Sequence, residues 1–258
     1  AIGAIWSSCS PDFGINGIVE RFSQIKPKVL FVTNEYFYNG KKINILERVS
    51  EIIKKIPTIK HVIVSNYPGE PEIKQLPKYK YIKTHKWENM IKADESKFSF
   101  SKFDFEHELA ILFSSGTTGK PKCICHKTGG VLLQHLKEHQ LHCDIKEHDN
   151  VFYFTTCGWM MWNWLISVLA SKASIVLFDG SPMYKKEDLL LRIANKENIT
   201  LLGVSAKYID ALRKTKKDFK KLYKLTKLRT ICSTGSPLSE DLSLIHISEP
   251  TRRTPISY

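Results

Sequence analysis

Ser114-Ser115-Gly116-Thr117-Thr118-Gly119-Lys120-Pro121-Lys122 stands directly after the apolar run at residues 109–113. Together the two stretches predict a buried strand that opens into a loop rich in glycine and hydroxyl groups. In such a loop the glycines let backbone N–H groups approach an anion closely. The hydroxyls and the lysine ammonium add donors and positive charge. The loop at residues 114–120 is therefore predicted to bind the phosphates of a polyphosphate ligand.

Two other interpretations of this loop are less consistent with its residues. A Walker A loop needs four residues between its glycines and a Ser or Thr after its lysine. Here only two residues separate the glycines, and Pro121 follows the lysine. Proline also prevents the helix that a Walker loop caps, so we expect the chain to leave the loop as a strand through residues 122–126. A Gly-Ser-Thr stretch is also typical of an ordinary surface turn, but the preceding strand and Lys120 favour the phosphate site.

The same stretch resembles the phosphate-binding signature of the adenylate-forming acyl-CoA synthetases. Two further stretches resemble the acetoacetate-activating branch of that family: Gly3-Ala-Ile-Trp-Ser-Ser-Cys-Ser-Pro-Asp-Phe-Gly14 and Phe154-Thr-Thr-Cys-Gly-Trp-Met-Met-Trp-Asn-Trp164. The three motifs occur in the family's order, and the resemblance runs from residue 1 to about Asp241. It implies an internal fragment of the large N-terminal adenylation domain.

The resemblance also implies where substrates bind. In related synthetases a turn that matches residues 234–237 lies against adenine, and the two positions after the Gly-Trp pair line the acyl pocket. Two bulky Met side chains there would leave a small pocket for a short acid. Segments that match residues 11–13 and 205–206 approach CoA in relatives, although the local residues differ. The implied site residues are Ser114, Ser115, Gly116, Thr117, Thr118, Gly119 and Lys120 for the ATP phosphates; Gly235, Ser236 and Pro237 for adenine; Trp159, Met160, Met161 and Thr234 for the acyl group; and Pro11, Asp12, Phe13, Ser205 and Ala206 for CoA.

Without the resemblance, some of these residues also fit ordinary structural roles instead of ligand binding. The Thr234–Pro237 stretch equally fits an ordinary β-turn. Trp162 and Trp164 fit a core helix better than a ligand pocket. Beyond Lys120 we expect no catalytic group within the chain.

The implied reaction is an AMP-forming acid–CoA ligation. Acetoacetate attacks ATP to give an acyl-adenylate and pyrophosphate, and CoA then takes the acyl group. ATP, CoA and Mg²⁺ are the implied cofactors, and the Mg²⁺ ligand, a ribose-binding Asp and a catalytic Lys are expected outside this chain. The isolated chain is expected to be inactive, because catalytic groups must be positioned together. Alternatives are a ligase for acetate, propionate or hydroxybutyrate, and a truncated, non-catalytic nucleotide-binding module.

The fold class is predicted from the βα rhythm of the chain. Apolar runs and amphipathic stretches alternate, which indicates an α/β fold with a doubly wound, mostly parallel sheet flanked by helices and ligands at the carboxyl ends of the strands. Strands are expected at residues 28–33, 61–65, 79–84, 109–113, 122–126, 151–155, 174–178, 199–204 and 228–232, and helices at 15–25, 46–56, 129–142, 162–170, 185–195 and 206–214.

The domain prediction is one partial adenylation domain over residues 1–242. Residues 243–258 have no continuous helical or strand period, contain two prolines, and resemble a translated sequencing adapter. We therefore expect this tail to be non-native.

The composition of the chain limits the classes of partner that we expect it to bind. The chain has 258 residues, 42% of them hydrophobic, and a formal net charge of +13. Its lysines are spread along the whole length without a nucleic-acid-binding motif, so solvated charge is expected rather than a nucleic-acid partner. No apolar run approaches the ~18 residues of a membrane helix and no signal peptide opens the chain. We expect small-molecule substrates, no membrane, no obligate protein partner and a cytosolic location.

The six cysteines mostly lie in apolar or strand-like contexts, which predicts buried, reduced thiols. A zinc site near residues 123–143 was weighed because His135 and His139 share a helix face. The Cys123-x-Cys125 spacing is that of a strand rather than a zinc knuckle, so no metal site is predicted.

Overall fold

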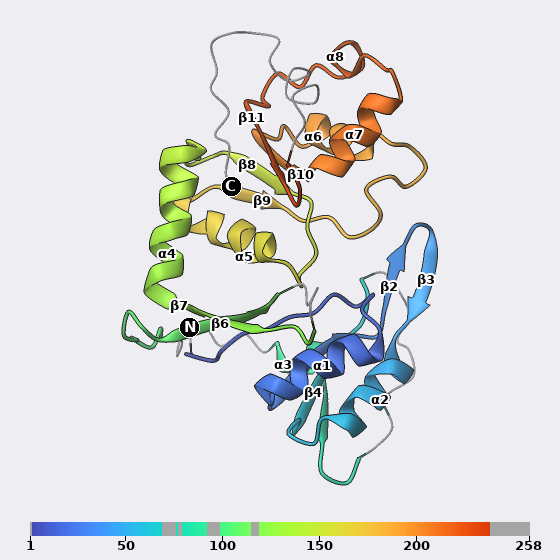
Figure 1. Ribbon diagram of the computed structural model, residues 1–258, viewed down its shortest axis with the longest axis vertical. Helices are drawn as coiled ribbons and strands as arrows, with labels where there is room; N and C mark the ends of the chain where they lie inside the picture. Colours follow the sequence, from blue (N-terminus) through green and yellow to red (C-terminus); the bar gives the residue numbers. More distant parts are fainter. Residues whose placement is uncertain (1, 69–75, 77–78, 92–98, 115–118, 238–258) are drawn as a thin grey trace. The chain divides into compact units, whose positions relative to one another are not determined.

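The computed structural model describes residues 2–68, 76, 79–91, 99–114 and 119–237. The chain forms two compact units, Ala1–Gly129 and Gly130–Tyr258. Figure 1 shows both units as mixtures of helices and strands, and each is described by itself below.

The first unit is built on a three-stranded parallel sheet of order β1-β4-β5. Two antiparallel pairs accompany it, β2 with β3 and β6 with β7. The elements are α1 (Ile15–Ile25), β1 (Val29–Thr33), β2 (Glu35–Tyr38), β3 (Lys41–Asn44), α2 (Leu46–Lys55), β4 (His61–Ser65), β5 (Lys83–Lys86), α3 (Trp87–Met90), β6 (Glu108–Phe113) and β7 (Cys123–Lys127).

One apolar cluster fills the first unit. Helix α2 buries Leu46, Val49, Ile52 and Ile53, whose spacing places them on one helix face. Sheet residues such as Leu30 and Val62 complete the same cluster. The expected strand–helix–strand order is therefore confirmed here, because an amphipathic helix covers a parallel pair.

The second unit holds a four-stranded sheet of order β11-β10-β8-β9, and all of its strand pairs are parallel. The elements are α4 (Thr128–Leu136), the π-helix η2 (Lys137–His142), β8 (Asn150–Tyr153), α5 (Met160–Ser167), the 3₁₀ turn η3 (Val168–Ser171), β9 (Ser174–Val176), α6 (Leu189–Lys196), β10 (Leu201–Ser205), α7 (Ala206–Lys214), α8 (Phe219–Leu222) and β11 (Thr230–Thr234).

Alternation along the strands sends side chains to two separate cores. Phe152 and Leu202 pack with α6 and α7, whereas Val151, Tyr153 and Leu201 pack with α5. Neighbouring strand residues point to opposite faces, so both faces of this sheet are covered by helices. This two-sided covering is the doubly wound arrangement predicted from the sequence.

Several element boundaries differ from prediction. Helix α6 begins at Leu189 rather than residue 185, because Lys185 has a φ of 63° in the left-handed region, which no helix continues through. The hairpin β2–β3 and the short helices α3 and α8 were not predicted. The hairpin had a signal, since Asn39 and Gly40 form its turn with φ angles of 49° and 77°.

The prediction of buried thiols is wrong for two cysteines. Cys123 and Cys125 are exposed, because their strand β7 pairs only with β6 within the described residues. The other four cysteines are partly buried.

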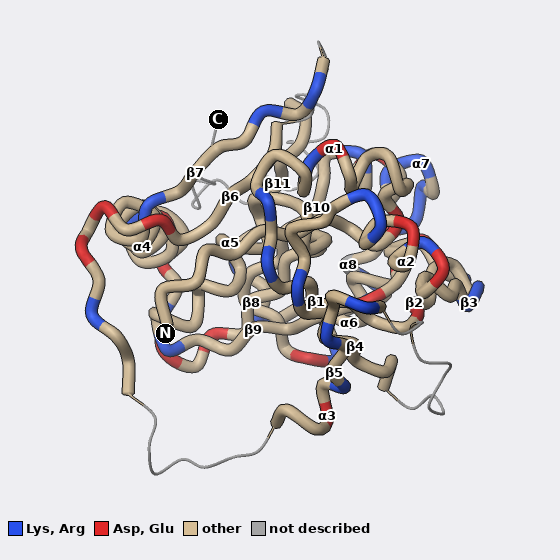
Figure 2. The backbone as a smooth tube through the Cα atoms, turned by 90° about the horizontal axis from the view of Figure 1, so that it is seen from below, with Lys and Arg blue, Asp and Glu red and all other residues tan. Residues whose placement is uncertain are grey.

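Charge and hydropathy add two observations. Figure 2 shows Lys and Arg in both units and on many elements, without one continuous basic run. On α7, Arg213 and Lys214 both pair with Asp210, which offsets part of the local positive charge. Within the part of the chain that the structure describes, no helix has the length and apolar character to cross a bilayer.

Candidate functional site

The predicted phosphate loop joins β6 to β7 in the first unit. Its base is closed by two hydrogen bonds: the Ser114 amide donates to the Lys122 carbonyl at 3.0 Å, and the Lys122 amide donates to the Ser114 hydroxyl at 2.9 Å. The strand predicted after Pro121 is confirmed as β7. Four of the predicted phosphate ligands lie outside the described residues: Ser115, Gly116, Thr117 and Thr118.

The outgoing end of the loop is exposed. Gly119 has a φ of 150° in a region that side chains rarely adopt, and a Cβ there would meet nothing within 4 Å. Lys120 is exposed. The backbone behind it is held, because the Gln24 amide of α1 donates to the Pro121 carbonyl at 3.0 Å. An exposed ammonium on a fixed backbone suits an anion such as phosphate. Sequence reasoning missed Gln24, which had no motif to mark it.

In the second unit, predicted segments lie at the carboxyl ends of neighbouring strands. Parallel neighbours β8, β10 and β11 end together, and a predicted site segment follows each of them. Trp159, Met160 and Met161 follow β8, and Ser205 ends β10. The predicted adenine turn, Thr234-Gly235-Ser236-Pro237, begins at the last residue of β11. Carboxyl ends of parallel strands are where α/β sheets bind ligands.

Tyr153 connects two of these segments. Its hydroxyl and the Thr234 hydroxyl are hydrogen-bonded at 2.9 Å. The ring is 4% exposed and lies directly beside Gly203, where an added Cβ would stand 2.0 Å from the ring. Burial raises the pKa of Tyr153 to about 12, so the phenol stays protonated and able to donate. Tyr153 is not among the predicted site residues, although a side chain with a polar tip at the end of an apolar strand was a usable signal.

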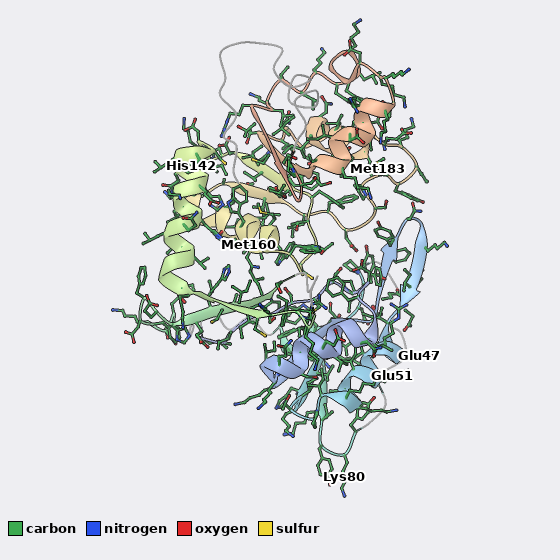
Figure 3. The ribbon with its side chains drawn as sticks, viewed as in Figure 1. Glu47, Glu51, Lys80, His142, Met160 and Met183 are labelled. Atoms are coloured by element: carbon green, nitrogen blue, oxygen red, sulfur yellow. The ribbon has the colours of Figure 1, made fainter. Side chains whose placement is uncertain are left out.

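The predicted acyl segment is divided between surface and core. Trp159 and Met160 are 53% and 38% exposed at the start of α5, where Figure 3 labels Met160. Met161 packs against the core cluster that contains Tyr153. The core interpretation is confirmed for Trp164, which is 4% exposed and donates its indole N–H to the Glu138 carboxylate at 2.8 Å.

The predicted adenine turn is exposed and has room at its centre. Gly235 has a φ of 93°, and a Cβ on it would meet nothing within 4 Å. Ser236 and Pro237 are exposed beside it. The turn therefore has a backbone conformation that glycine adopts easily, with open space beside it.

The residues predicted to approach CoA are divided between the two units. In the first, the Phe13 amide donates to the Ser10 carbonyl at 3.1 Å, and the Arg21 guanidinium lies 4.8 Å from the Phe13 ring centroid. Pro11 is partly buried and Asp12 is exposed. In the second, the Ser205 hydroxyl accepts from the Tyr208 amide at 3.2 Å and caps α7. Ala206 is 4% exposed.

The histidines weighed for zinc have other surroundings. His135 is hydrogen-bonded to the Ser167 hydroxyl at 2.6 Å, and the His139 ring lies edge-on to Trp164 with centroids 4.3 Å apart. Both rings are almost fully buried. Among the residues that the structure describes, no three His, Cys, Asp or Glu side chains are grouped to hold a metal ion. The Mg²⁺ ligand is expected outside this chain.

Comparisons with known proteins show which family the chain resembles. The profile of the family described as "AMP-binding enzyme" matches residues 1–244. Acetoacetyl-CoA synthetase from Gallus gallus is 44% identical over 242 residues, and that of Rhizobium meliloti is 44% identical over 243 residues. These alignments cover 92% and 93% of this chain, and each covers 36% of the relative.

A solved structure extends the comparison to the fold. Acetoacetyl-CoA synthetase from Streptomyces lividans matches with a TM-score of 0.85 and 38% identity, over 93% of this chain and 36% of that one. The chain thus spans about a third of the length of the proteins it resembles. The family profile covers nearly the whole sequence, and the parallel sheet is consistent with it. This chain therefore belongs to the AMP-binding enzyme family.

Proposed function

We propose that the chain is the substrate-binding part of an AMP-forming acid–CoA ligase whose acid is acetoacetate. The observation that carries the proposal is the 44% identity to acetoacetyl-CoA synthetases from animals and bacteria. Two adjacent Met residues at the start of α5, the helix that follows β8, support it, because bulky side chains there favour a short acid.

In this proposal each segment has a distinct task. The loop at residues 114–120 holds the β- and γ-phosphates, and the Lys120 ammonium neutralises charge that develops on departing pyrophosphate. The Thr234–Pro237 turn receives the adenine ring beside the open Gly235 position. The acyl pocket is formed by Trp159, Met160, Met161 and Thr234, and the Tyr153 hydrogen bond holds Thr234 in place.

The proposed reaction has two half-reactions. A carboxylate oxygen of the acid attacks the α-phosphorus of ATP, and the bond to pyrophosphate breaks, which gives the acyl-adenylate. The CoA sulfur then attacks the acyl carbon, and AMP leaves. The described residues contribute mainly by binding and orienting the reactants, which is a large part of such catalysis.

Binding to the chain as it stands is the first test. Saturation-transfer NMR with AMP and ATP should show transfer to the adenine protons. Lys120→Ala should weaken ATP far more than AMP, because only ATP carries the β- and γ-phosphates. Equal weakening of both nucleotides, or no transfer from either, would contradict the proposed division of the site.

Acid preference is tested in a polypeptide that joins this chain to the remaining segments of an acid–CoA ligase. Pyrophosphate release is measured with acetoacetate, acetate, propionate and 3-hydroxybutyrate. We expect acetoacetate to give the highest kcat/KM, and changing both Met160 and Met161 to Ala should shift preference toward larger acids. A preference for acetate or propionate in the unmodified protein would replace acetoacetate with another short acid. Nucleotide binding without turnover of any acid would favour a non-catalytic module.

A further inference from the structure

Strand β11, which carries the predicted adenine turn, is supported by its sheet on one side only. It lies at the end of the strand order and, within the described residues, pairs with β10 alone. All five of its residues are only partly buried. Less buried elements open more readily than the centre of a sheet. The position of the turn at residues 234–237 therefore depends on what holds β11 besides this one ladder.

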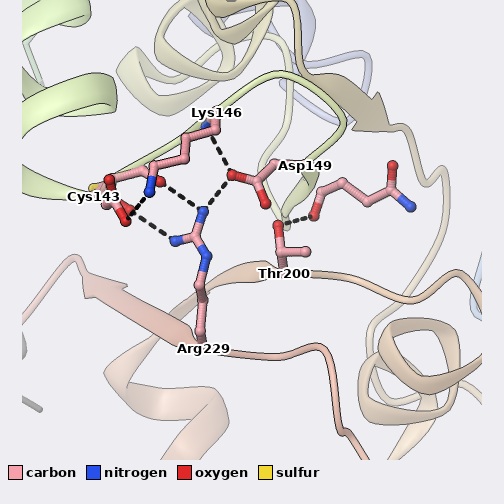
Figure 4. Close-up of polar contacts among 7 residues, drawn as sticks. Cys143, Lys146, Asp149, Thr200 and Arg229 are labelled. Atoms are coloured by element: carbon pink, nitrogen blue, oxygen red, sulfur yellow. Dashed lines mark hydrogen bonds and ion pairs between the residues drawn. The ribbon is translucent and has the colours of Figure 1, made fainter.

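Arg229, the residue directly before β11, makes three additional contacts (Figure 4). Its Nη1 donates to the Cys143 carbonyl at 3.0 Å, and its Nη2 donates to the Asp144 carbonyl at 2.7 Å. The same guanidinium pairs with the Asp149 carboxylate. These partners lie on the segment at residues 143–149, which leads into β8. One side chain therefore joins the amino end of β11 to the amino end of β8.

Asp149 is itself held from several directions. Its carboxylate accepts a hydrogen bond from the Lys146 amide at 2.8 Å, and its own amide donates to the Lys146 carbonyl at 3.1 Å. Its carbonyl accepts from the Ser174 amide of β9 at 2.8 Å. The side chains of Asp149 and Arg229 are 12% and 25% exposed, so water and salt screen this pair less than a surface pair. Arg229 thus binds a fixed partner.

A second bond holds the other end of β11. Tyr153 is the last residue of β8 and Thr234 the last residue of β11, and their hydroxyls are hydrogen-bonded. Both contacts join β11 to β8, although the two strands lie on opposite sides of β10 and do not pair with each other. The two contacts are about 16 Å apart along β11 at the ordinary rise per residue. A strand that is fastened at both ends moves less than one fastened at a single end.

We propose that Arg229 and Asp149 are positioning residues for nucleotide binding. They fix the amino end of β11 and, together with the Tyr153 bond at the other end, hold the Thr234–Pro237 turn where it receives adenine. Neither residue contacts the nucleotide, because each acts through the strand. Without the Arg229 bonds, β11 keeps its ladder to β10 but holds Gly235 less firmly in place. The inference rests on the proposed function, which assigns the turn to adenine.

Arg229→Gln and Asp149→Asn test the proposal in the full 258-residue chain. AMP affinity is measured by NMR titration well below the unfolding temperature of every variant, so that global unfolding does not contribute. We expect each change to raise the Kd for AMP by roughly tenfold, within the range known for residues that do not touch the ligand. Arg213→Gln is the matched control, because Arg213 also pairs with an aspartate, Asp210, but within α7. It should leave the Kd unchanged.

A double variant and Arg229→Lys separate positioning from a general loss of stability. If Arg229 and Asp149 act as one unit, the double variant should bind AMP about as weakly as the weaker single variant. Arg229→Lys keeps the positive charge but loses the forked donor geometry, so it should recover only part of the affinity. Additive losses, or an unchanged Kd in Arg229→Gln, would overturn the proposal. Full affinity in Arg229→Lys would overturn the role of the bonds to the Cys143 and Asp144 carbonyls.

Amide NMR of the nucleotide-free protein separates this inference from the proposed function. In Arg229→Gln, the Thr234 and Gly235 signals should shift or broaden and the amides of β11 should exchange faster, while those of α7 stay unchanged. If the unmodified chain binds no AMP, the proposed function fails, and these signals alone then decide whether Arg229 positions the turn. Unchanged Thr234 and Gly235 signals would overturn the positioning role whatever the nucleotide result.

Discussion

At the residue scale, the hydrogen bond between Tyr153 and Thr234 gives the first prediction. Tyr153→Phe removes the phenol oxygen and leaves the ring in its buried place. We expect a loss of about 1 kcal/mol in unfolding free energy, a typical net value for one hydrogen bond. We also expect weaker AMP binding, because Thr234 opens the predicted adenine turn.

A double-mutant cycle with Thr234→Val checks this assignment. If the two hydroxyls act through each other, the double variant should lose no more AMP affinity than the larger single loss. Additive losses would mean that Tyr153 and Thr234 affect the nucleotide independently. Denaturant unfolding of the unmodified chain, the two single variants and the double variant measures the change in unfolding free energy.

His139 supplies a pH prediction at the same scale. Burial lowers its pKa to about 4 from an ordinary value near 6.5, and the neighbouring His135 adds to that effect, while Glu138 opposes it. Below pH 6.5, His139 is therefore protonated in the unfolded chain. In the folded chain it stays neutral until about pH 4. Because the unfolded state binds more protons in this window, stability should fall as pH falls, by up to about 3 kcal/mol in all.

Guanidinium unfolding at several pH values between 7 and 4 measures this slope. His139→Phe should flatten it, since the variant ring carries no nitrogen to protonate. The exposed His142 of the same π-helix gives the matched control, and His142→Gln should keep the slope of the unmodified chain. An unchanged slope in His139→Phe would assign the acid sensitivity to other groups.

At the element scale, Gly203 limits how β10 packs. A Cβ there would stand 2.0 Å from the Tyr153 ring, a separation that the buried ring cannot accommodate in place. Gly203→Ala should cost about 1–3 kcal/mol through overpacking and displace the Tyr153 hydroxyl. Gly130→Ala in α4 is the matched control, because its Cβ would meet nothing within 4 Å and alanine favours helices by roughly 1 kcal/mol.

Thermal unfolding monitored by circular dichroism ranks these two variants. The expected order of midpoints is Gly130→Ala at or above the unmodified chain and Gly203→Ala well below it. If Gly203→Ala unfolds with the unmodified protein, the sheet tolerates a shift of Tyr153, and its role in holding Thr234 becomes doubtful.

The elements also show what sequence patterns can and cannot predict. Helix α1, strand β4 and helix α7 agree with their predicted bounds because apolar periodicity and local stop signals coincide. The change from α4 to the π-helix η2 had no local signal. It accompanies tertiary packing of His139 on Trp164 and the Glu138 bond to the same indole, which join distant segments.

In the candidate site, too, some features could be predicted from the sequence and others could not. Glycine positions were predictable from sequence, since Gly119 and Gly235 both adopt backbone angles that other residues rarely reach. Supporting side chains were not, because Gln24 acts on Pro121 from an unrelated helix. Tyr153 was missed for a similar reason, as its partner Thr234 lies on another strand.

At the scale of the whole molecule, the cores suggest that the second unit is an independent folding unit. The cluster of the first unit uses residues up to Phe113, and both clusters of the second begin at or after Cys143. A four-stranded parallel sheet with helices on both faces has the parts that a small domain needs. Expressed alone, residues 128–237 should therefore fold and unfold cooperatively.

Circular dichroism and hydrogen exchange on that fragment test the prediction. Amides of β8 and β10 should be the best protected, because these two strands are central in the sheet. The fragment also lacks the phosphate loop, so it should bind AMP but gain little from the two further phosphates of ATP. A fragment with helical content but no protected strand amides would mean that the sheet requires the first unit. The two units would then fold together as one cooperative domain. That outcome would agree with the single adenylation domain predicted over residues 1–242.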